Sequence, residues 1–319
     1  MALYGHVTRG LAKAGLPINE YWFSLVDSVI YSFHMPLFFF LSGLFFYDSL
    51  IKRGKTGLIF EKLITVIYPY ILWSLLQGLC EVLLSKYTNG ELRLDQVLSF
   101  AWEPRAQFWF LYALFLVFFL CSNIYLSVKH EYFLPLVVSF GVLFVFKEYL
   151  SLIRVTDYLL ANTVFFAFGV WFNEVKSYFE ARSSKLALIL FPLFICGQYL
   201  FHSTFGLNYR VGGLPMLLLT IISIFFIVTL SMAIGRFHFD TLLYIGSSSM
   251  TIYLMHILAA SGARVIFDKI MGIHSVDFHI AMGLLVGLAA PLLVQRAITR
   301  YKLDFLLTWP RSKPRTNAT

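Results

Sequence analysis

Residues 28 to 47 read SVIYSFHMPLFFFLSGLFFY, and they include no aspartate, glutamate, lysine or arginine. A helix of about 20 residues is about 30 Å long, which matches the hydrocarbon thickness of a bilayer. Hydrocarbon offers no hydrogen-bond partners, so the backbone groups of a spanning segment must be satisfied internally. This stretch therefore predicts a membrane-spanning α-helix.

The same pattern recurs along the chain. Of the 319 residues 59% are hydrophobic and 13% are charged, and the mean hydropathy is +0.76. Soluble domains contain roughly 25% charged residues, so a water-soluble fold is excluded. Short alternating strands are absent, which leaves helices as the spanning elements. The nine predicted spans cover residues 28–47, 63–84, 108–126, 132–146, 155–172, 186–201, 214–234, 242–260 and 280–294.

The apolar segment at residues 1–7 is too short to span a bilayer and has no basic region of a signal peptide. We interpret it as the tail of a tenth helix. The predicted fold class is thus an all-α integral membrane protein, a polytopic bundle of about ten transmembrane helices with the first truncated at the N-terminus. We expect one membrane domain over residues 1–295 and a basic cytoplasmic tail over residues 296–319.

Basic residues give the chain a formal net charge of +8, and they lie in short loops and in the C-terminal tail. This distribution is typical of membrane topology, and no nucleic acid is expected as a partner. Counted over alternate loops, 15 lysines and arginines lie on the side of the tail and 10 on the other. The tail is therefore predicted to be cytoplasmic. We expect a multi-pass protein of a cell membrane, the bacterial inner membrane, with membrane lipid around it.

Three histidines lie within or next to apolar segments: His6, His34 and His256. An ionisable side chain in hydrocarbon is costly, so each one is a candidate for a functional site that faces the interior of the bundle. The alternative is that each histidine serves only as a hydrogen-bond partner between helices.

Asp27, Tyr31 and His34 follow the helical spacing i, i+4 and i+7, which places a carboxylate, a phenol and an imidazole on one face. Pro36 cannot donate a backbone hydrogen bond to Ser32, so we expect a kink or a local opening beside His34. For Asp27 the alternative is an ordinary interfacial position, and the same holds for Glu81. Two further polar stripes are Ser249, Tyr253 and His256, and Ser74, Gln77 and Glu81.

A basic cluster of Lys52, Arg53 and Lys55 follows the first complete span, with Lys62 at the start of the next predicted helix. Such a cluster suits the phosphates of a cofactor at the cytoplasmic face, and the alternative is that it only sets the topology. The chain has no Walker or Rossmann glycine pattern and no zinc-hydrolase motif. No metal site is predicted.

Residues 33–43 read FHMPLFFFLSG, which resembles the second-helix motif of the membrane acyltransferase 3 family almost without deviation. Further segments are similar to that family in the same order, so the resemblance covers nearly the whole chain. They are Tyr4-Gly5-His6-Val7 at the end of the first helix, Pro69-Tyr70 at the start of the third, Phe108-Trp109-Phe110-Leu111-Tyr112, and residues 246–256 with His256.

This resemblance implies a ten-helix bundle that takes an acyl group, usually acetyl, from acyl-CoA on the cytoplasmic side and places it on a sugar hydroxyl. The chain looks most like the branch that modifies sugars of surface polysaccharides, including fucose O-acetylase-like members. The implied partners are acetyl-CoA or another acyl-CoA as the donor and a sugar or glycan as the acceptor. The acceptor class would be a surface polysaccharide, a lipopolysaccharide or a lipid-linked glycan precursor.

The chain departs from the family pattern at two places. The family usually has an arginine or lysine eleven positions before the first-helix histidine, and counting back from His6 this position falls before Met1. The family's basic pair before the Pro-Tyr segment is reduced here to Glu61-Lys62.

Acyl transfer to a hydroxyl needs a base that works near neutral pH, and imidazole is the natural choice. On the resemblance, His6 is the expected base, and His34 is expected to orient or relay the proton, with Asp27 or Tyr31 holding it. A transient acyl-histidine is the rival chemistry, because a base and a nucleophile look alike in sequence. The other expected site residues are Trp109, Tyr31, His256 and Glu81 for the substrate and Lys52, Arg53 and Lys62 for the acyl-CoA donor.

Two other classes of function suit the same composition. A transporter or flippase of polysaccharide precursors would also combine basic and aromatic residues in a helical bundle, although the sequence shows no inverted halves. A non-catalytic subunit of a glycan assembly system is the third reading. Binding or hydrolysis of acetyl-CoA by the purified protein would separate an enzyme from both.

Overall fold

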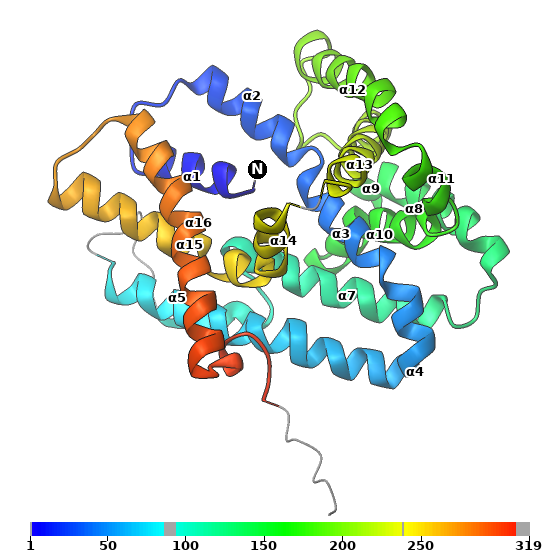
Figure 1. The fold of residues 1–319 in the computed structure, drawn as a ribbon, viewed down its shortest axis with the longest axis horizontal. Helices are drawn as coiled ribbons and strands as arrows, with labels where there is room; N and C mark the ends of the chain where they lie inside the picture. Colours follow the sequence, from blue (N-terminus) through cyan, green and yellow to red (C-terminus); the bar gives the residue numbers. More distant parts are fainter. Residues whose placement is uncertain (1, 86–93, 238, 311–319) are drawn as a thin grey trace, which may run out of the picture. The chain divides into compact units, whose positions relative to one another are not determined.

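The computed structural model describes residues 2–85, 94–237 and 239–310, and within these residues every regular element is a helix (Figure 1). Eight stretches in this part of the chain are long and apolar enough to cross a membrane. The predicted all-α polytopic membrane fold is confirmed. The eight stretches are Glu20–Leu44, Phe46–Leu83, Ala106–Ile124, Arg154–Phe172, Ser183–Thr204, Leu214–Gly235, Ser249–Ile270 and Val276–Tyr301.

Eight of the nine predicted spans correspond to these stretches, and two details differ. The span predicted at residues 132–146 is a shorter apolar helix, His130–Val145. The span predicted at residues 242–260 is displaced, because α14 (Asp240–Ser247) is a separate helix and the spanning stretch begins at Ser249. The sequence Gly-Ser-Ser-Ser at residues 246–249 explains the break, since glycine and serine are poor helix formers.

The chain falls into two compact units, Met1–Ile59 with Ala113–Tyr244, and Phe60–Tyr112 with Ile245–Thr319. Three helices, α4, α7 and α14, contribute residues to both. The helices of the first unit are α1 (Ala2–Lys13), α2 (Glu20–Tyr31), α3 (His34–Leu44), α4 (Phe46–Lys62), α7 (Trp109–Ile124), α8 (Phe133–Val145), α9 (Lys147–Leu150), α10 (Arg154–Phe172), α11 (Lys176–Ala181), α12 (Ser183–Tyr199), α13 (Leu214–Gly235) and α14.

The predicted opening beside His34 is present as a break at Ser32-Phe33, between α2 and α3. Because Pro36 has no N–H, the carbonyl of Ser32 loses its helical donor. The hydroxyl of Thr220 on α13 lies 2.8 Å from this carbonyl oxygen and donates to it, while also lying 2.7 Å from the Met216 carbonyl. A neighbouring helix thus satisfies the group that the proline leaves open, as a break within a membrane requires.

Helices α3 and α10 cross through two glycines. A Cβ at Gly43 would overlap the carbonyl oxygen of Phe166, and a Cβ at Gly169 would overlap the carbonyl oxygen of Phe40. The two backbones therefore approach as closely as glycine allows, which is a common device of helix association in membranes. The Asn173 side chain joins the same pair of helices by donating to the Leu44 carbonyl at 2.7 Å.

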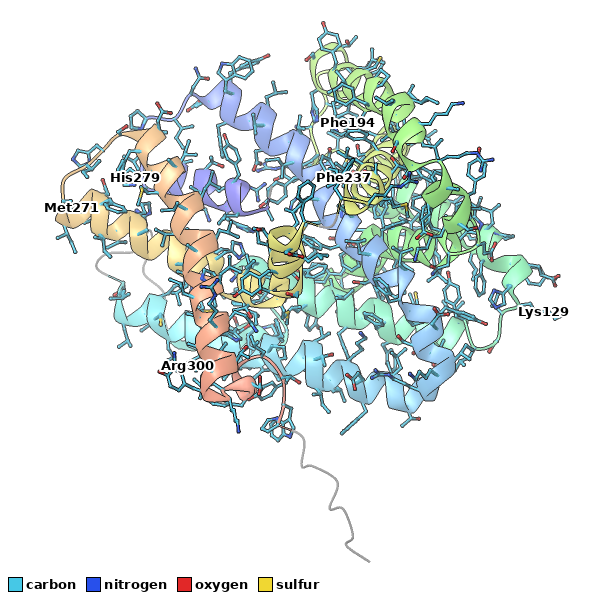
Figure 2. The ribbon with its side chains drawn as sticks, viewed as in Figure 1. Lys129, Phe194, Phe237, Met271, His279 and Arg300 are labelled. Carbon is cyan, nitrogen blue, oxygen red and sulfur yellow. The ribbon has the colours of Figure 1, made fainter. Side chains whose placement is uncertain are left out.

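Aromatic rings fill much of the first unit. Phe194 on α12, labelled in Figure 2, has its ring centroid 5.8 Å from that of Phe33 and 4.9 Å from that of Phe226 on α13. Phe33 is the residue at the α2–α3 break, and it is buried. Aromatic packing therefore holds the backbone at the position where regular helix hydrogen bonding stops.

The second unit contains α5 (Tyr68–Leu83), α6 (Leu94–Leu98), α15 (Ser249–Val265) and α16 (Val276–Tyr301). Single π-helical turns precede α5 at Leu63–Ile67 and follow α15 at Ile266–Ile270. Helix α15 packs along α16, and a hydrogen bond from Thr251 to Gln295 joins them. Figure 2 labels His279 toward one end of α16 and Arg300 toward the other.

The segment after α16 folds back onto α5. The Tyr68 hydroxyl donates to the Phe305 carbonyl at 2.8 Å, and Trp73 Nε1 donates to the Leu306 carbonyl at 2.7 Å. Helix α16 itself continues to Tyr301, beyond the expected end of the membrane domain at residue 295. The described part of the expected tail is therefore bound to the second unit by side-chain hydrogen bonds.

Candidate active site

His6 lies in α1, which continues for seven residues beyond it to Lys13. The helix is thus longer than the apolar segment predicted at residues 1–7. The reason is Arg9, whose charge ends the apolar run in the sequence but is neutralised in the fold by a carboxylate of α2. His6 therefore lies within a continuous helix.

Arg9 binds Asp27 through two parallel hydrogen bonds. Its Nε donates to Oδ1 at 2.8 Å, and its Nη2 donates to Oδ2 at 2.7 Å. The side chains are 30% and 10% exposed, so the pair is largely withdrawn from solvent and has the planar geometry that favours arginine. Sequence reasoning missed Arg9, although a cation in an apolar helix implies a carboxylate partner nearby.

The ring of Tyr31 contacts both predicted imidazoles. Its centroid lies 4.3 Å from that of His34 and 6.5 Å from that of His6, in edge-on arrangements. The guanidinium carbon of Arg9 lies 3.5 Å from the Tyr31 ring centroid, a cation–π contact. The structure thus brings together four of the predicted site residues, His6, Asp27, Tyr31 and His34, and adds Arg9.

His34 has a fixed orientation at the start of α3. Its Nδ1 lies 2.9 Å from the carbonyl oxygen of Ile30, at the end of α2. A carbonyl can only accept, so Nδ1 carries the proton of the neutral ring and Nε2 carries the lone pair. Nε2 is buried and has no hydrogen-bond partner among the described residues, and the Tyr31 hydroxyl shares this property. A proton acceptor and a proton donor without partners among these residues thus belong to two rings whose centroids lie 4.3 Å apart.

The segment 205–213, between α12 and α13, closes one side of this cluster. The Tyr209 hydroxyl accepts a hydrogen bond from Arg9 Nη2 at 2.9 Å, and its backbone N–H donates to Ser28 Oγ at 2.9 Å. His202 reinforces the segment, because its Nδ1 lies 3.1 Å from the Leu207 carbonyl and 3.3 Å from Ser28 Oγ. None of these contacts was predicted, since Tyr209 is far from α1 and α2 in sequence.

Arg210 is the exposed neighbour of Tyr209 and lies between two spanning helices. Its Nε donates to the Tyr209 hydroxyl at 3.3 Å, and this hydrogen bond raises the pKa of the guanidinium. Two guanidinium groups therefore meet at one phenol oxygen, and both are charged at physiological pH.

The second unit contains Glu81 in a chain of polar side chains. Glu81 accepts hydrogen bonds from Gln77 at 3.0 Å and from Arg105 at 3.4 Å, and Gln107 donates to Gln77 at 2.9 Å. The backbone carbonyl of Gln107 in turn accepts from the Tyr253 hydroxyl. Of the predicted stripe of Ser74, Gln77 and Glu81, the last two residues are joined by a hydrogen bond. The buried Gln107 joins them to α15.

Trp109 and His256 also belong to the second unit. Trp109 begins α7 and contacts the ring of Phe110 at a centroid distance of 6.5 Å. His256 is buried on α15, where its Nδ1 lies 2.9 Å from the Ile252 carbonyl and 2.8 Å from the Tyr253 carbonyl. This is the backbone anchoring that also fixes His34.

The basic cluster lies on α4 and not in a loop as predicted. Lys52 and Arg53 are exposed and precede Gly54, which interrupts the helix with φ 65°, whereas Lys62 is the last residue of α4. Lys55 donates to the Asn123 side chain of α7. The helix was not predicted because charged residues and two glycines interrupt the apolar pattern of this stretch. Lys52 and Arg53 remain the exposed candidates for phosphate contacts.

Within residues 2–85, 94–237 and 239–310, no three histidine, cysteine, aspartate or glutamate side chains gather as metal ligands do. In the first unit two imidazoles lie around a phenol, and such groups can act as general acids and bases. The sequence profile of the acyltransferase 3 family, described as an acyltransferase domain, matches residues 3–294. The chain belongs to the acyltransferase 3 family. It is thus a multi-pass membrane acyltransferase, and His6, Arg9, Tyr31 and His34 all lie within the matched residues.

One curated relative is similar to part of the chain. The chain is 26% identical over 121 residues to the nodulation protein NolL of Mesorhizobium japonicum. The aligned stretch covers 38% of this chain and 31% of that protein. No solved structure matches the chain.

Proposed function

We propose that this acyltransferase moves an acetyl group, or another acyl group, from acyl-CoA to a sugar hydroxyl. The acceptor is a surface polysaccharide, a lipopolysaccharide or a lipid-linked glycan precursor, and the protein acts in the bacterial cell membrane. Membership of the acyltransferase 3 family supports the reaction class.

The observation that carries the proposal is a pair of buried polar atoms without hydrogen-bond partners, one on Tyr31 and one on His34. The Tyr31 hydroxyl and His34 Nε2 are buried without a hydrogen-bond partner among the described residues. Buried polar groups are normally paired, because leaving one unpaired costs about 1–3 kcal/mol. A site of this kind suits a bound substrate that supplies the missing donor and acceptor.

In the proposed step the acceptor hydroxyl oxygen attacks the carbonyl carbon of the thioester while its proton passes to an imidazole nitrogen. The tetrahedral intermediate then expels the CoA thiolate as the C–S bond breaks, and the imidazole returns the proton to the sulfur. The products are a sugar ester and free CoA. In this proposal the Tyr31 hydroxyl donates a hydrogen bond to the oxyanion of the intermediate.

We assign the base to His6 and the orienting or relaying role to His34, with Asp27 acting through Arg9. The geometry also favours a second assignment, with His34 as the base, because its Nδ1 bond to Ile30 leaves Nε2 as the acceptor. A transient acyl-histidine is a third course for either ring. Single-turnover rates of His6→Ala and His34→Gln distinguish the base from the orienting residue.

The donor is proposed to approach from the cytoplasmic face, where Lys52 and Arg53, with Lys62, supply positive charge for the CoA phosphates. Glu81, Trp109 and His256 are proposed as contacts to the acceptor. Carboxylate, indole and imidazole groups suit a sugar, since they combine hydrogen-bonding atoms with a flat apolar ring.

The decisive experiment compares the surface glycans of producing cells with and without the gene by mass spectrometry, alongside purified protein supplied with labelled acetyl-CoA. We expect loss of one acetyl group from a glycan in the deletion and transfer of label by the purified protein. His6→Ala should abolish both acetylation of the glycan in cells and transfer of label by the purified protein, with the exposed His130→Ala as a control. Unchanged glycans together with no consumption of acetyl-CoA would favour a transporter or flippase.

A further inference from the structure

Arg9 joins three segments of the first unit. It lies on α1, it binds Asp27 on α2 through two hydrogen bonds, and it donates a third to Tyr209 in the segment 205–213. The third bond spans 200 positions along the chain. The guanidinium is therefore restrained from two directions.

Tyr209 is itself held at both ends. Its backbone N–H donates to Ser28 Oγ on α2 at 2.9 Å, and its hydroxyl accepts from Arg9 at 2.9 Å. Its ring centroid lies 5.3 Å from that of Tyr31. The backbone of Tyr209 is thus bound to the Ser28 side chain, and its hydroxyl is bound to the guanidinium that lies over the Tyr31 ring.

The Tyr31 ring is confined by these contacts. Arg9 lies 3.5 Å from the ring centroid, and His34 meets the ring edge-on with the centroids 4.3 Å apart. The Tyr31 hydroxyl itself makes no hydrogen bond to a described residue, so contacts with the ring must fix its position. A guanidinium that moved more freely would therefore restrain the Tyr31 ring less.

We propose that Tyr209 is a positioning residue of the acyl-transfer reaction. Its hydroxyl fixes the Arg9 guanidinium over Tyr31, and this holds the Tyr31 ring in contact with His6 and His34. The inference rests on the proposed function. Tyr209 acts through Arg9, so its loss should lower kcat and leave the KM values for donor and acceptor unchanged.

The first test is Tyr209→Phe, which keeps the ring against Tyr31 and removes only the hydroxyl. We expect kcat to fall about tenfold, the usual effect of one hydrogen bond to a charged group, with both KM values within about twofold of wild type. Tyr199→Phe is the matched control, because Tyr199 lies on α12 before the same segment and is 64% exposed. An unchanged kcat, or a raised acceptor KM with normal kcat, would overturn the proposal.

The second test is a double-mutant cycle with Arg9→Lys, which keeps the charge but loses the two-pronged pairing. If Tyr209 acts through Arg9, adding Tyr209→Phe to Arg9→Lys should reduce kcat no further than Arg9→Lys alone. Full additivity of the two effects would show independent roles and would refute the inference.

A third readout does not depend on the reaction. Amide hydrogen exchange in the segment 205–213 and in α1 should become faster in Tyr209→Phe, and should be unchanged in Tyr199→Phe. Purified protein that transfers no acyl group from any acyl-CoA would refute the proposed function, while faster exchange would still support the restraint by Tyr209. Exchange equal to wild type in Tyr209→Phe would refute the restraint itself.

Discussion

Gly5 on α1 lies directly against the ring of Tyr31 on α2, where a Cβ at position 5 would come within 2.8 Å of the ring atom Cε2. The ring cannot move aside easily, because Arg9 covers one of its faces at 3.5 Å. The close approach of the two helices therefore depends on glycine.

Gly5→Ala should displace either α1 or Tyr31 and lower the acyl-transfer rate. Overpacking of this kind typically costs about 1–3 kcal/mol of stability, which thermal unfolding in detergent would measure. Gly10→Ala is the control on the same helix, since a Cβ there would meet nothing within 4 Å. Equal behaviour of the two variants would contradict the packing of α1 on α2.

The crossing of α3 and α10 gives a second prediction. A Cβ at Gly43 would overlap the backbone oxygen of Phe166, and a backbone atom has no alternative rotamer. We expect Gly43→Ala to be destabilised by about 3 kcal/mol, the upper end of overpacking effects, and to yield little folded protein. Gly235→Ala, at the end of α13 with open space around it, should unfold at the wild-type temperature or slightly above.

Removing the charge of Asp27 should destabilise the first unit. Asp27→Asn leaves Arg9 without its anion, and a fully buried pair broken in this way loses about 3–5 kcal/mol. Because the Arg9 side chain keeps 30% exposure, we expect a smaller loss, about 2 kcal/mol. Chemical denaturation followed by tryptophan fluorescence would measure it.

The matched control for this charge removal is Glu180→Gln. It breaks the exposed Lys176–Glu180 pair on α11, whose side chains are 43% and 53% exposed. An exposed pair of this type contributes about 0.5 kcal/mol or less. A loss in Asp27→Asn no larger than in Glu180→Gln would mean that Arg9 does not need its partner.

The basic cluster on α4 gives a prediction about the affinity for the acyl-CoA donor. In the double variant Lys52→Ala/Arg53→Ala we expect the KM for acetyl-CoA to rise about tenfold with kcat retained, because two charge-assisted contacts to phosphate are lost. Lys176→Ala, another exposed lysine, should leave the KM unchanged. Steady-state kinetics with acetyl-CoA and with its 3′-dephospho form would show which phosphate is bound, and an unchanged KM with both would remove Lys52 and Arg53 from the donor site.

The spans could be predicted because the length and apolarity of a segment are local properties. Residues 214–234 were predicted as a span and form α13, Leu214–Gly235, almost to the residue. The opening beside His34 was also predictable, since Pro36 removes one backbone donor wherever it occurs in a helix. Local chemistry failed where charged residues or glycine interrupt a helix, as in α4 around Gly54 and in α1 beyond Val7.

The candidate site was predicted only in part. The spacing of Asp27, Tyr31 and His34 placed them on one face, and the resemblance to the acyltransferase 3 family pointed to His6. Neither source pointed to Arg9 or Tyr209, because a helical stripe shows which residues of one segment share a face and not what faces them. The Arg9–Asp27 bond joins positions 18 apart and the Arg9–Tyr209 bond positions 200 apart.

The sequence alone determined that the chain is a polytopic membrane protein and where its proline break lies. It also identified the histidines as candidates for a functional site, because ionisable side chains are costly in hydrocarbon. Only the tertiary structure decided which groups are paired and which are left open. Arg9 and Asp27 neutralise each other, and Thr220 satisfies the Ser32 carbonyl. The Tyr31 hydroxyl and a ring nitrogen of His34 have no hydrogen-bond partner in the described part of the chain. The physical reason is that the apolar composition of one segment is enough to make it a membrane span. Side-chain hydrogen bonds between segments depend in addition on how the helices pack against one another.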